Sequence, residues 1–365
     1  MTRLRVVTYL AVVLAIVTWW IDNAKPTTIP AGPGLVLDKS WLADTSKSAA
    51  PAEQIRPADQ TFLTFPEWFL VFGPAEQADY FDHSTATTFP FLVHISQLWD
   101  SYWIVYQQVN GNYPFNGGYH LMIMVISVSS TVEFAVKEAY ETVIGRLTDT
   151  GSPETDEDRF YATYMHDYVR DIGTEGWFLF DFPTRLKMLW TETSWTGPHM
   201  LRKWERKYFL TTELLFKIGY AKIIAWATHA TYTPNIEETE VVLDRLPGEL
   251  KARIPELKVL QAYPDGSAMV LVPREAPFLP ESLEIAAEGL NTREIAGHNS
   301  AILLSAFVPA DWHGASPDYK VIFTQVVPTK PGLKRIAVAT PIPHFADTLR
   351  QLTQEHAIIE HVFDF

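Results

Sequence analysis

Cysteine is absent from the 365 residues, which excludes disulfides, thiolate nucleophiles and cysteine-ligated metal sites. Basic side chains are also scarce, since 29 Lys and Arg stand against 43 Asp and Glu, a formal net charge of −14. A chain with this charge is repelled by a phosphate backbone, so we expect no nucleic-acid partner. The lack of cysteine assigns no compartment, because such a chain tolerates both reducing and oxidising surroundings.

Common catalytic motifs are missing too. The sequence contains no nucleophile elbow, Walker loop, dinucleotide-binding glycine fingerprint, zincin histidine pair or Glu-x-x-His di-iron pair. What is present is 47% hydrophobic and 20% charged residues, enough for one large or two ordinary globular domains. The sequence therefore names no cofactor and leaves open whether the protein is an enzyme.

The N-terminus predicts a membrane anchor. Val6 to Ile21 is uncharged and mostly apolar, follows Arg3 and Arg5, and ends in bulky tryptophans, a poor context for signal cleavage. We expect residues 1–22 to form an uncleaved transmembrane anchor with a cytoplasmic N-terminus. For a bacterial chain this predicts the inner membrane, with the rest of the protein in the periplasm. Residues 23–60, rich in Pro, Ala, Ser and Thr, are interpreted as a flexible tether.

An aromatic-rich helical domain is expected over 61–235, and it contains two candidates for further spans. Residues 120–147 follow a long uncharged stretch, and residues 208–232 follow a basic cluster at 202–207 that suits a cytoplasmic flank. Against the second candidate stand Glu213, Lys217 and Lys222, which are costly inside a bilayer. A single anchor and a three-span arrangement both remain open.

The remaining residues, 236–365, predict an α+β domain. Strands at 258–263 and 268–273 flank a Pro-Asp-Gly turn, and further strands fit 300–307, 319–327, 333–340 and 357–365. Helices near 280–290 and 345–356 complete an order close to β-α-β-β-α-β. That order favours a ferredoxin-like sandwich, an antiparallel sheet with two helices on one face.

Four residues are the candidate site residues. Glu133 and Glu213 are acids on otherwise apolar helices, and as catalytic candidates they compete with simple ion pairing to Lys137 and Lys217, each four residues later. His120, after a flexible glycine pair, and His166, among tyrosines, are the candidate metal ligands, unless they are ordinary hydrogen-bonded histidines.

A fifth residue, Glu67, has capping-box spacing from Thr64, so we interpret it as part of a helix N-terminus.

These features favour a membrane-anchored cell-envelope protein that acts as a scaffold, assembly factor or accessory subunit. Its partners would then be the lipid bilayer and another membrane or envelope protein. One alternative is a membrane-bound, metal-dependent oxidoreductase or other enzyme acting on a hydrophobic substrate. A second is a lipid or small-ligand carrier with an apolar pocket in the aromatic region around 90–120.

Overall fold

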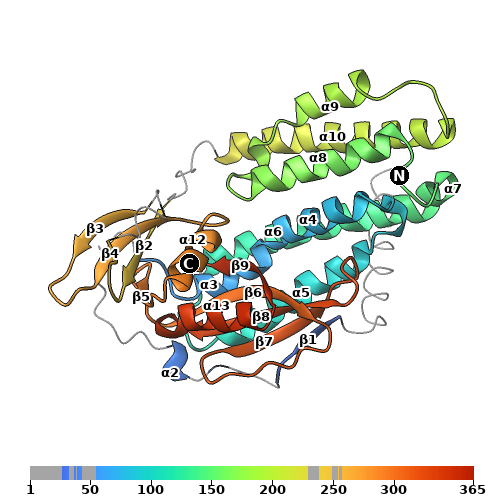
Figure 1. Cartoon of the computed structure of the whole chain (residues 1–365). Coiled ribbons are helices and arrows are strands. Elements are labelled where there is room, and N and C mark those ends of the chain that lie inside the picture. The colour runs from blue at the N-terminus through green and yellow to red at the C-terminus, as the bar shows by residue number, and fades with distance from the viewer. Residues whose placement is uncertain are drawn as a thin grey trace. The chain divides into compact units, whose positions relative to one another are not determined.

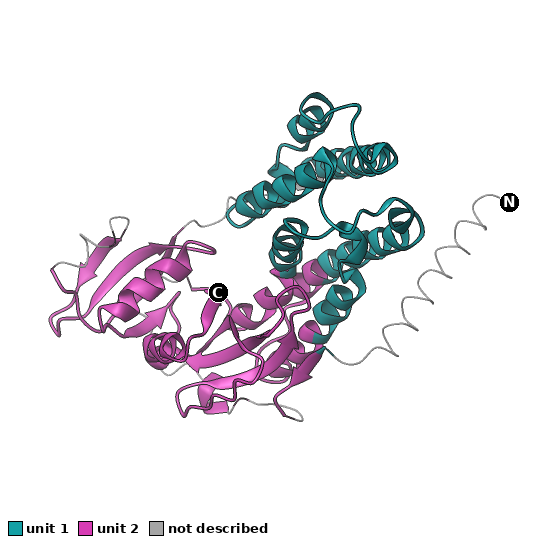
Figure 2. Cartoon of the chain, turned by 45° about the vertical axis from the view of Figure 1, so that its right-hand side comes forward, with its two compact units in different colours: residues 1–27, 69–100, 124–229 teal, residues 28–68, 101–123, 230–365 magenta. Residues whose placement is uncertain are grey.

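The computed structural model describes residues 27–32, 37, 39–42, 55–228, 238–248, 254 and 257–365. The expected anchor at 1–22, most of the tether and residues 229–237, which include the expected domain boundary between 235 and 236, lie outside these residues. The chain divides into two compact units, shown in Figure 2: unit 1 comprises residues 1–27, 69–100 and 124–229, and unit 2 comprises 28–68, 101–123 and 230–365. Helices and two antiparallel sheets make the fold α+β, as the sequence predicts.

Unit 1 is helical. Its elements are α4 (Phe69–Phe81), the first half of α5 (Phe91–Val109), most of α6 (Gly117–Tyr140), a π-helical turn (Glu141–Gly145), α7 (Arg146–Thr148), α8 (Asp156–Ile172), α9 (Phe182–Thr191) and α10 (Met200–Thr228). The helix expected over 120–147 is present and runs without interruption from Gly117 to Thr148. The helix expected to start at residue 208 begins eight residues earlier, so the basic cluster lies within it.

The core of unit 1 is built largely from aromatic rings. Phe81 packs on Tyr161 with ring centroids 4.7 Å apart, and Tyr168 meets Phe180 edge-on at 5.2 Å. Rings of this size bury large apolar areas and interlock in tilted and edge-to-face geometries. Figure 1 shows α8, α9 and α10 lying side by side, and each contacts the other two.

Unit 2 holds both sheets. Five strands are arranged in the order β1-β7-β8-β6-β9, and four in the order β3-β4-β2-β5. Their bounds are β1 (Thr28–Pro30), β2 (Glu238–Leu243), β3 (Lys258–Ala262), β4 (Ala268–Pro273), β5 (Thr292–Ile295), β6 (Ala301–Pro309), β7 (Lys320–Val326), β8 (Leu333–Pro341) and β9 (Ile358–Phe363). The expected hairpins β3–β4 and β7–β8 both form.

One apolar core joins these sheets to two helices, α12 (Phe278–Ala287) and α13 (Phe345–Gln354). The rings of Phe278 and Phe345 stack across the helix pair at 6.5 Å. The strand expected at 268–273 is β4, which pairs with β2 and β3 and not with the strands that follow α12. The connection from β6 to β7 contains no helix in the described residues 310–319.

A short helix from the N-terminal part of the chain, α3 (Gln60–Glu67), packs on the five-stranded sheet. Thr61 Oγ1 donates to the Phe363 carbonyl at 2.7 Å and accepts from the Leu303 amide at 2.9 Å, which ties α3 to two strands. Phe65 packs edge-on against Phe323. Part of the expected tether is likewise ordered into the fold, because β1 pairs antiparallel with β7 and a four-residue helix, α2, spans Lys39–Leu42.

Candidate functional site

The two acids singled out in the sequence meet at one lysine in unit 1. Lys137 Nζ lies 3.0 Å from Glu133 Oε1 and 3.0 Å from Glu213 Oε1, so it joins α6 to α10. Lys217 Nζ lies 3.1 Å from Glu133 Oε1, across the helices, whereas the sequence interpretation paired it with Glu213 on its own helix. Two cations and two anions thus form a balanced cluster, in which Lys137 is buried and the Glu133 side chain keeps 38% exposure.

Tyrosines of α8 surround this cluster. Lys137 Nζ lies 5.8 Å from the ring centre of Tyr161, and Lys217 Nζ lies 5.3 Å from that of Tyr168. The hydroxyl of Tyr164 is buried and has no hydrogen-bond partner among the residues described. Since each acid has a lysine within 3.1 Å, the arrangement acts first as an ion-pair network that fixes α6 against α10.

The basic cluster at the start of α10 is buried in a second set of ion pairs. Arg206 Nη1 lies 2.7 Å from Glu141 Oε1, and Arg202 Nη2 lies 2.7 Å from Asp158 Oδ1. Glu157 receives two lysines, Lys203 and Lys207, each at 2.9 Å. All four basic side chains are at most 4% exposed, so they are neutralised inside unit 1 and do not form an exposed positive flank.

Unit 2 contains a separate acid–phenol pair. Tyr119 donates its hydroxyl proton to Glu67 Oε2 at 2.6 Å, and Thr64 Oγ1 lies 3.0 Å from the same phenol oxygen. The capping-box interpretation is wrong: Asp59 precedes α3, Thr64 bonds back to the Gln60 carbonyl, and Glu67 is the last residue of the helix. Burial raises the pKa of Glu67, while the hydrogen bond from Tyr119 opposes that rise.

Close to this pair, two arginines hold the last residues of the chain. Arg56 Nη1 donates to the Phe365 main-chain oxygen at 2.7 Å, and Arg274 Nε donates to Asp364 Oδ2 at 3.2 Å. Burial lowers the pKa of Arg56 to about 10, helped by the neighbouring Arg274, and burial raises the pKa of Asp364. The sequence analysis missed this group because no spacing along the chain connects positions 56, 67, 119, 274 and 364.

The two candidate metal ligands lie in different units. His120 Nδ1 is 3.0 Å from the Tyr102 hydroxyl, and its ring stacks on Phe115 at 4.7 Å. His166 is an exposed residue of α8 whose Nε2 lies 3.0 Å from Asp82 Oδ2. Within the described part of the chain, no three His, Asp or Glu side chains are grouped closely enough to hold a metal ion.

The exposed side of the continuous helix Gly117–Thr148, formed by α6, the π-helical turn and α7, carries a row of apolar side chains. Six aliphatic side chains, spaced three, four or seven residues apart, are between 48% and 78% exposed: Val125, Val128, Val132, Val136, Val143 and Leu147. We call this set the α6 stripe. On the same helix the polar residues Ser127, Lys137 and Glu141 are buried. Among the described residues, Gly117–Thr148 is the one helix long and apolar enough to cross a membrane, and only 22% of its most apolar stretch is buried.

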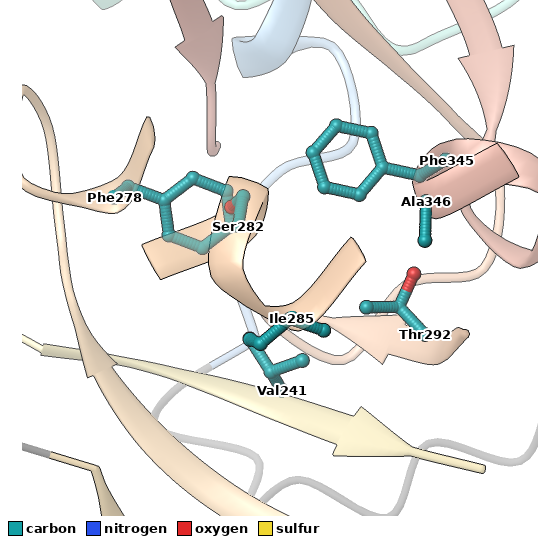
Figure 3. Close-up of a pocket in the computed structure, with 7 residues that line it drawn as sticks. All are labelled: Val241, Phe278, Ser282, Ile285, Thr292, Phe345 and Ala346. Atoms are coloured by element: carbon teal, nitrogen blue, oxygen red, sulfur yellow. The ribbon is translucent and has the colours of Figure 1, made fainter. Parts of the chain in front are cut away.

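A small cavity lies in the core of unit 2. Its volume is about 10 Å³, and Figure 3 shows its lining, which includes Phe278, Ser282, Thr292 and Phe345. Such a volume holds about one water molecule and does not admit a lipid or an organic substrate. The cavity also lies outside the region around 90–120 where the sequence analysis placed an apolar pocket.

Comparison with known proteins adds no assignment, because no protein-family model, curated protein or solved structure matches this chain. The chemistry of the site therefore rests on its own residues: paired buried charges inside unit 1 and an apolar surface outside it.

Proposed function

We propose that this protein is a membrane-attached envelope protein whose helical unit contacts the lipid bilayer through the α6 stripe. In this proposal it acts as a scaffold or accessory subunit, and unit 2 binds an envelope partner. The observation that carries the proposal is the polarity of the helix Gly117–Thr148, which exposes a row of valines while its charged residues Lys137 and Glu141 are buried. A surface helix of a water-soluble protein has the opposite pattern, since its apolar face packs on the core.

The free-energy cost of exposing the α6 stripe to water supports this proposal. Full burial of a Val or Leu side chain contributes about 1.5–3 kcal/mol relative to exposure to water. For six side chains that are roughly half exposed, the burial free energy that is not gained in water is on the order of 5–10 kcal/mol. Contact with lipid hydrocarbon tails would remove these side chains from water and so provide that free energy. A contiguous apolar patch of this kind is typical of a membrane or protein contact.

The buried charges agree with the same proposal. Charged residues in membrane-embedded helices face the bundle interior and pair with one another. Lys137 with Glu213, and Arg206 with Glu141, are pairs of this kind between α6, its π-helical turn and α10. Because these ions are mutually neutralised, a structural role for Glu133 and Glu213 is favoured over acid–base catalysis.

The location and the finer fold belong to the proposal as well. We propose the bacterial inner membrane, with residues 1–22 as the anchor, the N-terminus cytoplasmic and the C-terminal part periplasmic. For the five-stranded sheet we propose a ferredoxin-like relationship, because the order β7-β8-β6-β9 with α13 between β8 and β9 resembles that sandwich. The missing helix between β6 and β7 is a departure from it.

A pair of spin-labelled variants tests the membrane contact. The chain has no cysteine, so Val128→Cys and Val259→Cys each provide one labelling site without further changes. Val128 is in the α6 stripe, and Val259 is an exposed valine of the edge strand β3, which serves as the matched control. In phosphatidylcholine vesicles we expect the label at 128 to collide with oxygen much more often than with a water-soluble nickel complex, and the label at 259 to collide readily with the nickel complex. Equal access of the nickel complex to both labels would contradict the proposal.

A further inference from the structure

A second apolar stripe runs along α10. Its members follow one another at intervals of one, three, four or seven residues, which places them on one side of the helix, and all are exposed: Leu201, Trp204, Tyr208, Leu215, Phe216, Ile223 and Trp226. The exposed fraction reaches 71% at Leu201, 72% at Phe216 and 81% at Trp226. We call this set the α10 stripe. Figure 1 shows α10 as one long helix beside α8 and α9, and these lie on its charged side.

All but one of the charged residues of α10 lie away from this stripe. Arg202, Lys203, Arg206 and Lys207 are at most 3% exposed, and further along Glu213 and Lys217 face the α6 cluster. One charged residue, Lys222, is exposed, and it lies one turn from Trp226, near enough to the helix end for its ammonium to reach water. By composition α10 is less apolar than a typical span, because its apolar part contains Glu213, Lys217 and Lys222, but the first two of these are paired toward α6 and not directed outward.

Tryptophans lie near both ends of the stripe, and the distance between them matches a bilayer. At about 1.5 Å per helical residue, Trp204 and Trp226 are roughly 33 Å apart along the axis. The hydrocarbon core of a bilayer is about 30 Å thick, and tryptophan is enriched at both of its boundaries. A protein partner imposes no such length, so the match favours lipid as the occupant.

Three indoles gather at the first of these ends. Trp195 lies 5.4 Å from Trp190 and 5.6 Å from Trp204, measured between ring centroids. Trp195 is 55% exposed and Trp204 is 40% exposed, in a loop and a helix start that also expose Leu201. Clustered, half-exposed tryptophans have an apolar body and a polar N–H, which suits the headgroup boundary.

From this geometry we infer that α10 is a second lipid-facing helix, whose outer face crosses the full hydrocarbon layer. The Trp190–Trp195–Trp204 cluster lies at one boundary and Trp226 at the other. The inference rests on the proposed membrane contact of unit 1 and extends it, because it assigns a second lipid-facing surface and the depth of its residues in the hydrocarbon layer.

A depth profile along α10 in phosphatidylcholine vesicles tests the inference with the full chain. Spin labels are placed at Leu201→Cys, Phe216→Cys and Trp226→Cys, with Leu215→Cys as a second central site if Phe216→Cys does not fold. We expect the ratio of oxygen to nickel-complex collisions to be highest at 216 and several-fold lower at 201 and 226. Val259→Cys is the aqueous control, and Val128→Cys reports the α6 contact.

The outcomes separate the two claims. A flat, aqueous profile along α10 with a lipid-exposed label at 128 overturns the inference and leaves the proposed function intact. Aqueous labels at both 128 and 216 overturn both. If the label at 216 excludes both collision reagents and shows spin–spin broadening between copies, a second copy of the chain covers the α10 stripe, and the inference is wrong. A peak at 216 with minima at both tryptophan ends supports it.

Discussion

Mild acidification is expected to destabilise unit 2 through His361. This residue of β9 is 3% exposed, its ring stacks on Trp68 with centroids 3.5 Å apart, and Phe363 meets it edge-on at 4.8 Å. Burial among these rings lowers the pKa of His361 from 6.5 to about 3. The folded protein therefore holds a neutral imidazole at pH 5, whereas the unfolded chain binds a proton there.

The sign and size of the effect follow from linkage. The pKa of His361 is lower in the folded protein than in the unfolded chain. The free energy of unfolding is therefore not reduced by this residue above pH 6.5, and it decreases as the pH falls from 6.5 toward 3. Each pH unit in this window costs about 1.4 kcal/mol, so going from pH 6.5 to pH 5 costs about 2 kcal/mol. Glu67 and Asp364, whose pKa values are raised, act in the opposite direction, so a variant is needed to isolate the histidine.

Hydrogen exchange of the β9 amides measures this loss within unit 2 itself, after correction for the intrinsic pH dependence of exchange. In the natural protein the opening free energy should fall between pH 6.5 and pH 5. In His361→Phe, which keeps an aromatic partner for Trp68 and has no titratable group, the fall should be smaller by about 2 kcal/mol. The same pH dependence in both proteins would refute the assignment to His361.

Three further predictions concern the polar pairs and the outer face. Tyr119→Phe removes the 2.6 Å hydrogen bond to Glu67 and should lower stability by about 1.5–3 kcal/mol in thermal unfolding, and an unchanged midpoint would show that the bond contributes nothing. Lys137→Met leaves Glu213 buried without its cation and should cost about 3–5 kcal/mol in detergent. Adding Glu213→Leu should recover part of that loss, and no recovery would argue against the pair. Val136→Asp, on the α6 stripe, should leave the helix content in circular dichroism unchanged yet weaken vesicle binding, and unaltered binding would count against lipid contact there.

Local patterns in the sequence predict most of the secondary structure. Pro264-Asp265-Gly266 and Lys330-Pro331-Gly332 mark the turns of two hairpins that form, and the periodic stretches at 280–290 and 345–356 are the helices α12 and α13. These features depend on backbone propensities and turn chemistry within a few residues. The i,i+4 pair of Glu133 and Lys137 is found for the same reason.

Features that depend on distant partners are not predictable in this way. The start of α10 was expected to be an exposed basic flank, but acids from α8 and from the π-helical turn bury it. Strand β4 joins a sheet with β2 because of pairing across 25 or more residues. Glu67 resembles a cap by spacing, and only the tertiary fold brings Tyr119 to its carboxylate. Pairing of this kind is set by packing, which a single sequence does not record.

Membrane attachment without the N-terminal apolar run tests the central claim most directly. Residues 25–365 lack Val6 to Ile21 but retain α6 and α10. If the apolar face of unit 1 contacts lipid, this shorter chain should remain in the membrane pellet after washing with alkaline carbonate. Its release as a folded, water-soluble protein would contradict the account, because the α6 stripe would then be stable in water.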